Sequence, residues 1–378
     1  MKNLVSNNEM NNKSPSRHEF ELTLFGNGYG ECVLLHVCDN KWIIIDSCIN
    51  PWTKKIAPIE YLESVGVDAS KQVKLLVISH WHDDHIEGFS RIYQLCINAK
   101  LALSQAMHQR EFFRFINVVH QRPIYSYAGK STDEIKQILD TMLNRKEISG
   151  EYKCKWVSND SILYNEKIET KGSDAKIVAL SPLDHSITTA LVEISNLIPK
   201  ANTQIRVNSS INPNHFAIVL WISIGDIHIL LGSDLEERAH PKGAWSVIAN
   251  NGTRPNDMAD IFKVPHHGSQ NAYCNLVYEK MLTDNHLSLL TPFTHGKVAL
   301  PNHSDIKRLK EKKCSGLYLA CRVSSKKNRH DAVVEKILKE STKSRETLNS
   351  FGYITLRKNV LDGKDDWQII TYGNATKL

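Results

Sequence analysis

One short segment carries most of the chemistry that this sequence offers. Residues 79–85 read Ser-His-Trp-His-Asp-Asp-His, so three imidazoles and two carboxylates stand within seven residues. His80 and His82, two residues apart, can reach one metal ion, and the adjacent Asp84 and His85 can reach a second ion nearby. Burying these groups without partners is costly, which disfavours a purely structural role. The segment therefore predicts a binuclear metal site.

The ligand types limit both the metal and the reaction. All the candidate ligands offer nitrogen or oxygen and none is a cysteine, so Zn²⁺ and Mn²⁺ both fit. Two divalent cations lower the pKa of a bound water and yield hydroxide at neutral pH. This hydroxide can attack a phosphorus or carbonyl centre, with Asp84 helping to hold it. A hydrolase is the expected class of enzyme.

The elements around this segment are expected to alternate between strands and helices. Residues 79–85 follow an apolar strand at 73–78 and precede a helix, so they lie in a loop, where functional residues are common. Strand signals continue to the end of the chain without repeats, which favours one elaborated α/β domain. Further strands are expected at 19–25, 32–38, 42–45, 100–103, 176–180, 216–222, 227–232, 260–264, 287–291, 352–356 and 367–372, and helices at 56–64, from 86, and across 105–145.

Two more carboxylates follow expected strands. Asp46 ends the strand at 42–45, and Asp234 follows an apolar strand in Gly232-Ser233-Asp234. Together with residues 79–85, they resemble the motifs of metallo-β-lactamase-fold hydrolases. The resemblance implies an α/β fold, a four-layer αββα sandwich with helical insertions. It also implies that Asp46 orients the metal-binding histidines and that Asp234 bridges the two metals.

Other segments resemble the hydrolase domain of the competence protein ComEC. They are residues 28–31, 180–182, the region of Asn214, and Pro265-His266-His267-Gly268-Ser269, which is the most diagnostic. The resemblance implies nuclease activity and a later histidine that completes the metal site. His303, before an expected helix, fits that role, with His295 as a rival. His266 or His267 is then expected to contact the substrate oxygen or to protonate the leaving group.

Two positions depart from the family pattern. Glu87 replaces the first glycine of the family's Asp-His-x-Gly-Gly motif, which alters one tight turn. The wider fold uses a histidine near position 214, where this sequence has Asn214 followed by His215. An asparagine there leaves the metal at His80 and His82 with fewer protein ligands. Whether His215 replaces the missing ligand stays open at this point.

The positive charge of the chain is concentrated late in the sequence. The net charge is +6, and residues 307–345 hold thirteen Lys or Arg against four acids, a surplus of +9. Such a segment can bind nucleic acid, but a solvated helical face is the alternative. Four lysines are expected to contact the substrate: Lys310, Lys312, Lys326 and Lys327.

The expected organisation is a disordered tail at 1–17 and a hydrolase domain at 18–378. The domain carries a helical insertion at about 105–150 and a basic insertion at about 323–350. The N-terminus has no apolar signal region and no apolar run approaches a bilayer span, so a cytoplasmic protein without a membrane anchor is expected.

Three functions remain in competition. The first is a metal-dependent phosphodiesterase, a nuclease acting on DNA and gated by a trigger, for example in phage defence. The second is a small-molecule or choline-phosphate-type phosphoesterase. The third is a regulatory effector subunit that is active only with a protein partner, or as a homo-oligomer. The aromatic residues Phe112, Phe113 and Phe115 of the helical insertion offer either a partner surface or a satellite core.

Overall fold

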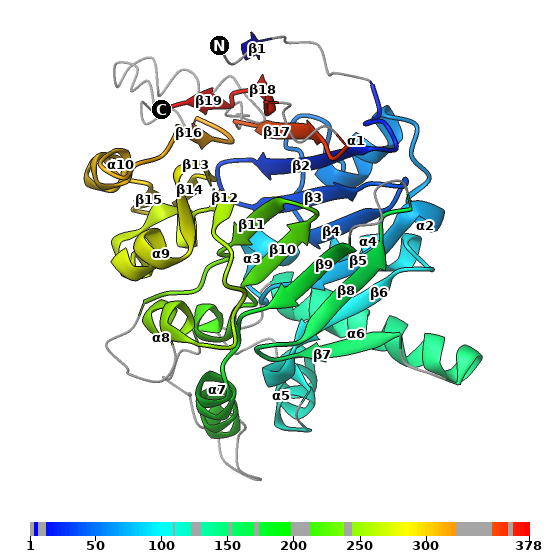
Figure 1. Ribbon diagram of the computed structural model, residues 1–378. Helices are drawn as coiled ribbons and strands as arrows, with labels where there is room; N and C mark the ends of the chain where they lie inside the picture. Colours follow the sequence, from blue (N-terminus) through cyan, green and yellow to red (C-terminus); the bar gives the residue numbers. More distant parts are fainter. Residues whose placement is uncertain are drawn as a thin grey trace, which may run out of the picture.

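Two large β-sheets lie face to face, and helices cover their outer faces (Figure 1). The structure is a computed structural model that describes residues 4–6, 13–108, 110–121, 130–150, 153–169, 174–197, 212–237, 244–322, 350–361 and 366–378. The four layers are helix, sheet, sheet and helix. The expected αββα sandwich is therefore confirmed.

The first sheet has nine strands and combines the N-terminal half of the chain with its C-terminal hairpin. The pairs β4–β5, β5–β6 and β6–β7 are parallel, whereas β17, β2, β3 and β4 pair antiparallel. In spatial order the strands are β1 (Leu4–Ser6), β18 (Gln368–Gly373), β17 (Gly352–Asn359), β2 (Glu19–Gly26), β3 (Glu31–Val37), β4 (Trp42–Asp46), β5 (Val73–Ile78), β6 (Lys100–Ser104) and β7 (Cys154–Val157).

The second sheet has eight strands from the C-terminal half. Its central pairs β11–β12, β12–β13 and β13–β16 are parallel. In spatial order the strands are β19 (Thr376–Lys377), β16 (Gly316–Leu319), β13 (Leu282–Leu290), β12 (Ala259–Lys263), β11 (Ile227–Leu231), β10 (Leu220–Ile224), β9 (Asp174–Ala179) and β8 (Ile162–Lys167). A separate hairpin joins β14 (Phe293–His295) and β15 (Val298–Leu300).

Both faces of each central strand are buried, which explains why these strands read as continuous apolar runs. In β3, Leu34 packs beneath the helices, whereas Val33 and Leu35 face the other sheet. In β10, Trp221 points to the helices and Ile222 to the other sheet. Because side chains alternate along a strand, each run supplies two cores at once.

The helices fall into two outer layers. On the first sheet lie α1 (Ala57–Ser64), α2 (Ala69–Gln72), α3 (Asp83–Ile86), α4 (Phe89–Leu95), η1 (Gln105–Met107), α5 (Arg110–Gln121) and α6 (Lys130–Ser149), and α7 (Asp184–Leu197) packs against α5. On the second lie α8 (Trp245–Asn250), α9 (Asn275–Lys280) and α10 (His303–Lys310), together with the short turns η3 (His266–Gly268) and η4 (Gln270–Ala272). The turn η2 (Pro213–Phe216) contacts α7 and buries Phe216 in the core beneath the helices of the first sheet. Among the described residues, none of these helices has the length and apolarity needed to cross a membrane.

The helices α5 and α6 lie in the segment predicted to be a helical insertion, and two aromatic side chains of α5 are buried. Phe112 and Phe115 are 0% and 4% exposed and belong to the core beneath the helices. Phe112 lies 4.8 Å from Trp81, measured between ring centroids. Phe113 is half-buried against the same core. The segment therefore packs into the core beneath the helices of the first sheet rather than forming a separate satellite core, and Phe112 and Phe115 are not available to a partner.

Two expectations differ from the structure. Within the tail expected to be disordered, Leu4–Ser6 form β1 and pair in parallel with β18. The strand expected at 216–222 begins only at Leu220, because Pro213–Phe216 form a 3₁₀ turn that Asn212 caps through the N–H of Asn214. The expected basic insertion at about 323–350 lies outside the described residues, apart from residue 350.

A buried histidine in β3 is expected to make folding stability depend on pH. Burial lowers the pKa of His36 from 6.5 to about 4, although its Nδ1 lies 2.8 Å from the carbonyl oxygen of Glu19. Between about pH 6.5 and about pH 4, His36 therefore binds a proton in the unfolded chain but not in the folded chain. Stability is full above about pH 6.5 and declines as the pH falls towards about 4. From about pH 7.5 to about pH 5 the loss through His36 is about 2 kcal/mol.

Urea unfolding of the wild type and of His36→Gln at both pH values checks this expectation. The variant removes the titrating group, so the difference between the two proteins isolates His36 from the other histidines. Equal pH dependence in both proteins would contradict the expectation.

Candidate metal centre

Most of the predicted metal-site residues meet at one edge of the sandwich, where parallel strands of both sheets end: Asp46, residues 79–85, Asp234, His266 and His267. Asp46 ends β4 and residues 79–85 follow its parallel neighbour β5. Asp234 follows β11, and His266 and His267 follow its parallel neighbour β12. The carboxyl ends of parallel strands lie at the same edge, so residues far apart in the sequence converge there.

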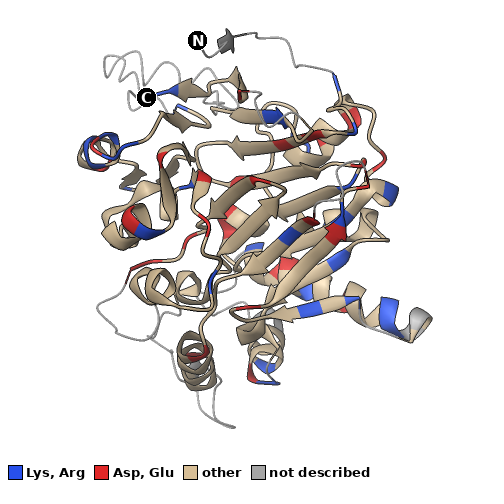
Figure 2. Cartoon of the chain, viewed as in Figure 1, with Lys and Arg blue, Asp and Glu red and all other residues tan. Residues whose placement is uncertain are grey.

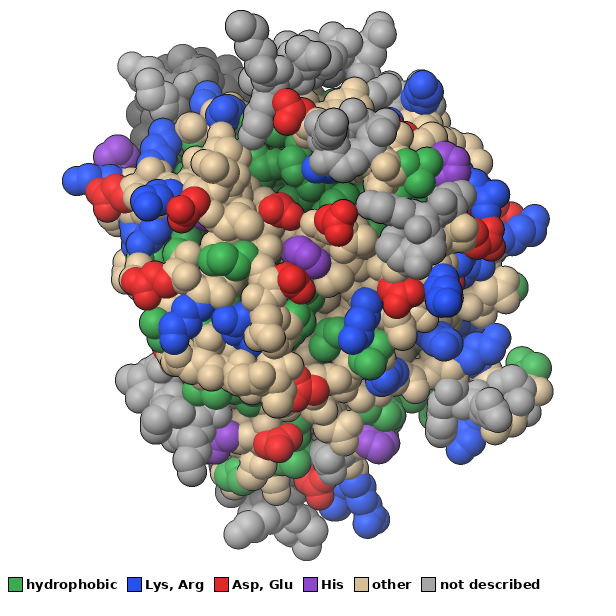
Figure 3. All heavy atoms as spheres, viewed as in Figure 1, with side chains coloured by type: hydrophobic (Ala, Val, Ile, Leu, Met, Phe, Trp, Pro, Cys, Tyr) green, Lys and Arg blue, Asp and Glu red, His purple; other side chains and the backbone are tan. Residues whose placement is uncertain are grey.

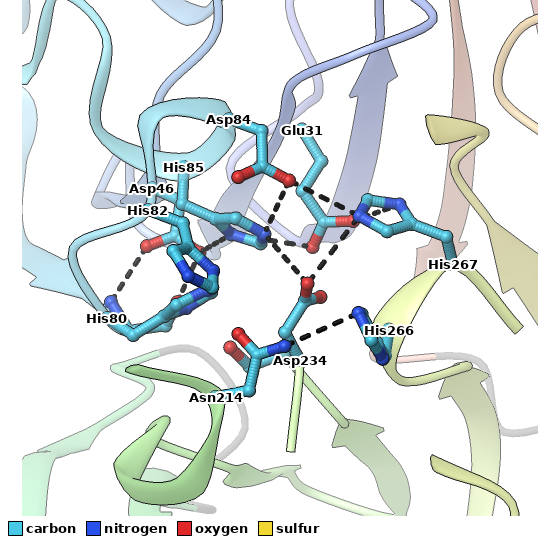
Figure 4. A network of polar contacts seen from close by, with 12 residues as sticks. Glu31, Asp46, His80, His82, Asp84, His85, Asn214, Asp234, His266 and His267 are labelled. Carbon is cyan, nitrogen blue, oxygen red and sulfur yellow. Dashed lines mark hydrogen bonds and ion pairs between the residues drawn. The ribbon is translucent and has the colours of Figure 1, made fainter. Parts of the chain in front are cut away.

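Two imidazoles and two carboxylates converge on one point (Figure 4). The Nε2 of His85 lies 3.6 Å from Oδ2 of Asp84 and 3.4 Å from Oδ2 of Asp234. The Nε2 of His267 lies 3.4 Å and 3.5 Å from the same two oxygens. All four side chains are buried, and neither Nε2 has a hydrogen-bond partner among the described residues.

These distances fit a divalent cation. Ligand atoms about 2.0–2.1 Å from a tetrahedral ion are about 3.3–3.4 Å from one another. A cation at the centre would also satisfy the two orphaned ring nitrogens. The metal-site prediction thus agrees with the donor set and its spacing.

Each histidine is held in position from its far side. His85 Nδ1 lies 2.8 Å from Oδ2 of Asp46, and Asp46 also accepts hydrogen bonds from the amide N–H and the hydroxyl of Ser79. His267 Nδ1 lies 3.1 Å from the hydroxyl oxygen of Thr291. Since the Nδ1 contacts fix both rings, their Nε2 atoms point to the common centre.

The buried carboxylates of Asp84 and Asp234 are balanced by positive charge on the histidines beside them. Burial alone lowers the pKa of His85, but the carboxylates of Asp234 and Asp84 outweigh it and hold that pKa well above its ordinary value. Asp234 also raises the pKa of His267 against the effect of burial. Conversely, burial raises the pKa of Asp234, and the two histidines bring it well below its ordinary value. A divalent cation can take the place of the protons that otherwise balance these carboxylates.

His80 and His82 form a second nitrogen pair beside this cluster. Nε2 of His80 and Nδ1 of His82 are 3.2 Å apart, and the ring of His80 lies 4.2 Å from that of His85. Burial lowers the pKa of His80 well below its ordinary value, so its ring is neutral and suited to bind metal. The pair is the natural position for a second ion.

Asn214, the residue at the position where the wider fold uses a histidine, lines the same cleft as His82. Its Nδ2 donates to Oε1 of Glu236 at 3.0 Å, while its Oδ1 is buried without a hydrogen-bond partner among the described residues. The free oxygen is a candidate ligand. His215 instead lies beside Asn212 and Glu236, with its Nε2 3.3 Å from Nδ2 of Asn212. The contacts of His215 therefore do not support its use as the replacement ligand.

The structure differs from the sequence prediction at His303. This residue is exposed at the start of α10, where Asn302 and Asp305 form a capping box. The polar residues of this segment thus have the spacing of a helix cap rather than of a ligand set. The rival His295 is also exposed, on β14, with its ring 5.7 Å from that of Tyr29. His267, not His303, converges on the cluster.

His266 and His267 point in different directions, as adjacent residues were expected to do. His266 is half-buried, with its Nδ1 3.0 Å from Oδ1 of Asn271 and its Nε2 3.3 Å from Nδ2 of Asn214. Both histidines have positive φ angles, 47° and 54°. This left-handed backbone is strained for non-glycine residues and clusters at functional sites.

Two of the four predicted substrate-binding lysines can be placed. Lys310, at the end of α10, is exposed, and the basic residues of this helix are visible in Figure 2. Lys312 donates to Oδ1 of Asn275 and lies 5.0 Å from the ring centre of Tyr273. Lys326 and Lys327 lie outside the described residues. On the face shown in Figure 3, the described Lys and Arg side chains are interspersed with Asp and Glu.

Three polar residues beside the candidate metal ligands are not among the residues predicted from the sequence. Glu31, at the start of β3, lies within 4.8 Å of the ligand atoms of His85, Asp234 and His267. Lys263 is 1% exposed and ion-pairs with Glu31, and the hydroxyl of Thr291 donates to Glu31. A usable signal was present, because a lysine inside the apolar run Ile-Phe-Lys-Val is seldom buried without a partner.

A cleft of about 390 Å³ opens over the cluster. Its lining combines the candidate ligands Asp84, Asp234 and His267 with aromatic side chains. The rings of Tyr29 and Phe293 are stacked at 5.3 Å, and Phe293 stacks in turn on His267 at 5.1 Å. A substrate in this cleft would meet the candidate metal centre and an aromatic wall.

Comparison with solved structures finds proteins of the metallo-β-lactamase fold. The metallo-β-lactamase fold protein YhfI from Bacillus subtilis is 12% identical, with 79% of this chain and 95% of that chain covered and a TM-score of 0.37. A putative metallo-β-lactamase from Thermotoga maritima is 14% identical over 57% of this chain and 79% of its own, with a TM-score of 0.31. The hydrolase AbOPH of the β-lactamase superfamily is 14% identical over 54% of this chain and 55% of its own, with a TM-score of 0.30.

No family model and no curated protein matches this sequence. At these identities and scores the structural likeness concerns the fold alone. The candidate site is defined by this chain's own residues.

Proposed function

We propose that this chain is a metal-dependent phosphodiesterase of the ComEC-like kind that cleaves nucleic acid, with DNA as the favoured substrate. The observation that supports it most is the pair of orphaned Nε2 nitrogens, which face two carboxylates beneath an open cleft. Two divalent cations, Zn²⁺ or Mn²⁺, would supply an activated water and stabilise negative charge on the phosphate.

Each group in the cluster has a role in this proposal. Asp84, His85, Asp234 and His267 hold one cation, because their ligand atoms have the required spacing. His80, His82 and the Oδ1 of Asn214 would hold the second cation. Since an amide oxygen is a weaker ligand than imidazole, we expect the second ion to bind less tightly.

His266 is proposed as the group that delivers a proton to the leaving oxygen. It lines the cleft and is partly open to solvent, so it can exchange protons. Its neighbours Asn271 and Asn214 hold the ring in place. Departure of an alkoxide needs an acid, and an imidazole held beside the cleft can serve as one.

The aromatic wall favours a substrate with planar groups. Tyr29 and Phe293 stack on each other and line the cleft together with Trp81 and Phe115. Nucleobases stack on such rings with about 1–3 kcal/mol per base, independently of sequence. The exposed Lys310 on α10, the helix next to the His266–Gly268 turn, adds an electrostatic attraction for phosphates.

A choline-phosphate-type esterase is the alternative that the same wall supports, because aromatic rings also bind quaternary ammonium groups. A partner-gated effector is a further proposal. It would use other surfaces, since Phe112 and Phe115 are buried.

Incubating the chain with Mn²⁺ or Zn²⁺ and a panel of phosphodiesters tests the proposed function. The panel contains plasmid DNA, single-stranded DNA, RNA, bis-p-nitrophenyl phosphate and p-nitrophenyl phosphorylcholine. Cleavage of DNA by the wild type, absent in Asp84→Ala, is expected. Cleavage of the choline ester alone would favour the alternative, and no cleavage of any diester by the metal-loaded chain would refute a phosphodiesterase.

Tyr29→Ala is expected to raise the KM for a single-stranded oligonucleotide by about 10-fold, because one stacking ring is lost. Tyr29→Phe keeps the ring and should retain the wild-type KM. An abasic oligonucleotide should show the same KM with all three proteins, and metal content should not change. An equal loss on the normal and abasic substrates would show that Tyr29 does not stack with bases.

A further inference from the structure

A lysine is buried against the candidate metal centre. Lys263, the last residue of β12, is 1% exposed, and its Nζ donates to the carbonyl oxygen of Ser233 at 3.0 Å. The same Nζ pairs with Oε1 of Glu31 and lies 3.7 Å from Oδ1 of Asp234. The ammonium group thus lies between two carboxylates. One is that of Asp234, which faces the Nε2 atoms of His85 and His267, and the other is that of Glu31.

The carboxylates of the cluster differ in whether their oxygens have hydrogen-bond or ion-pair partners other than the two histidines. Both oxygens of Glu31 are engaged, Oε1 with Lys263 and Oε2 with the hydroxyl of Thr291. By contrast, Oδ2 of Asp84 and of Asp234 face the Nε2 atoms of the histidines. Glu31 is nonetheless close enough to compete for the metal, because its Oε1 lies 3.9 Å from Nδ1 of His85, its Oε2 lies 3.8 Å from Nδ1 of His267, and one of its oxygens lies within 4.8 Å of a carboxylate oxygen of Asp234.

We propose that Lys263 is a positioning residue that withholds Glu31 from the metal and thereby sets the metal preference of the site. Lys263 and Thr291 occupy the two Glu31 oxygens, so the cation is left with Asp84, His85, Asp234 and His267. This inference rests on the proposed metal centre but not on the proposed reaction.

The consequence follows from ligand chemistry. Two imidazoles and two carboxylates make a four-coordinate site that suits Zn²⁺. A further carboxylate adds hard oxygen ligands and a higher coordination number, which suit Mn²⁺ better. Because Lys263 occupies an oxygen of Glu31 that could otherwise bind the metal, it should weaken the binding of Mn²⁺ relative to the binding of Zn²⁺.

Lys263→Met tests this directly, because methionine keeps the length of the side chain without its charge. The dissociation constants of Mn²⁺ and Zn²⁺ are measured by titration of the metal-free chain. The loss of a positive charge should tighten the binding of both ions, so the informative quantity is their ratio. We expect the ratio to move about 10-fold towards Mn²⁺ in Lys263→Met and to return to the wild-type value in Lys263→Met/Glu31→Gln. The visible absorption of bound Co²⁺ should weaken in the single variant, as coordination rises above four.

The single variant Glu31→Gln tests the proposal even if Lys263→Met does not fold. Glutamine can still accept from Lys263 through its oxygen and donate from its amide to the hydroxyl oxygen of Thr291, so metal affinity should stay within about 3-fold of the wild type, whereas Asp84→Asn should lose it. A loss in Glu31→Gln as large as in Asp84→Asn would overturn the proposal, since Glu31 would then already be a ligand. An unchanged Mn²⁺ to Zn²⁺ ratio in a folded Lys263→Met would overturn it as well. A wild-type chain that binds metal but cleaves no phosphodiester would refute the proposed function and leave this test intact.

Discussion

His267→Ala is expected to abolish metal binding at the cluster and to lower kcat/KM for phosphodiesters by more than about 100-fold. Replacing a residue that merely orients a metal ligand already costs about 10- to 100-fold, and His267 offers its own nitrogen. The Nε2 of this ring is buried, has no hydrogen-bond partner in the described part of the chain, and lies within 3.5 Å of both Asp84 and Asp234. No other described histidine has this relation to both carboxylates except His85.

His303→Ala is the matched control, because the sequence pattern predicts His303, rather than His267, as the metal ligand. Its side chain is exposed at the start of α10, so both metal content and kcat/KM should remain within about 3-fold of the wild type. Elemental analysis after dialysis and steady-state kinetics on bis-p-nitrophenyl phosphate provide the two readouts. Metal retained in His267→Ala but lost in His303→Ala would reverse the assignment.

Asp46→Asn is expected to weaken metal affinity by about 10- to 100-fold while leaving the fold intact. Asp46 accepts from the N–H and hydroxyl of Ser79 and faces Nδ1 of His85 at 2.8 Å. An asparagine preserves the shape but offers only one acceptor oxygen. The His85 ring then loses the carboxylate that keeps its Nε2 free of a proton and aimed at the metal.

Asp83→Asn provides the comparison within the same motif. Asp83 also lies beside the cleft, but its carboxylate accepts from the N–H of Ser131 and does not touch a histidine of the cluster. Removing its charge should change metal affinity by less than about 3-fold. Equal losses in Asp46→Asn and Asp83→Asn would mean that general electrostatics, not the orientation of His85, controls metal binding.

The local features of the site were accessible from the sequence. Strand β5 coincides with the predicted strand at 73–78, and the spacing of His80, His82, Asp84 and His85 already indicated metal ligands. A strand that is buried on both faces must be apolar throughout, and a turn after it brings adjacent side chains together. Such short-range rules need no knowledge of the rest of the fold.

The choice between equivalent histidines required the tertiary structure. His266, His267, His295 and His303 all stand near the ends of expected elements, and their side-chain directions depend on how the two sheets pack. The positive φ angle of His267 and its contact with Thr291 aim one ring at the cluster, whereas the capping box of α10 leaves His303 in solvent.

Which local segments carry candidate ligands follows from the order of the residues alone, because metal-binding spacing and strand burial are set by neighbouring residues. Which distant groups complete the candidate centre depends on how the two sheets pack. Glu31 and Lys263 are separated by more than two hundred positions in the chain, and they meet because β3 and β12 belong to opposite sheets whose ends converge at the site. Their pairing depends on long-range packing, for which no spacing rule in the sequence exists.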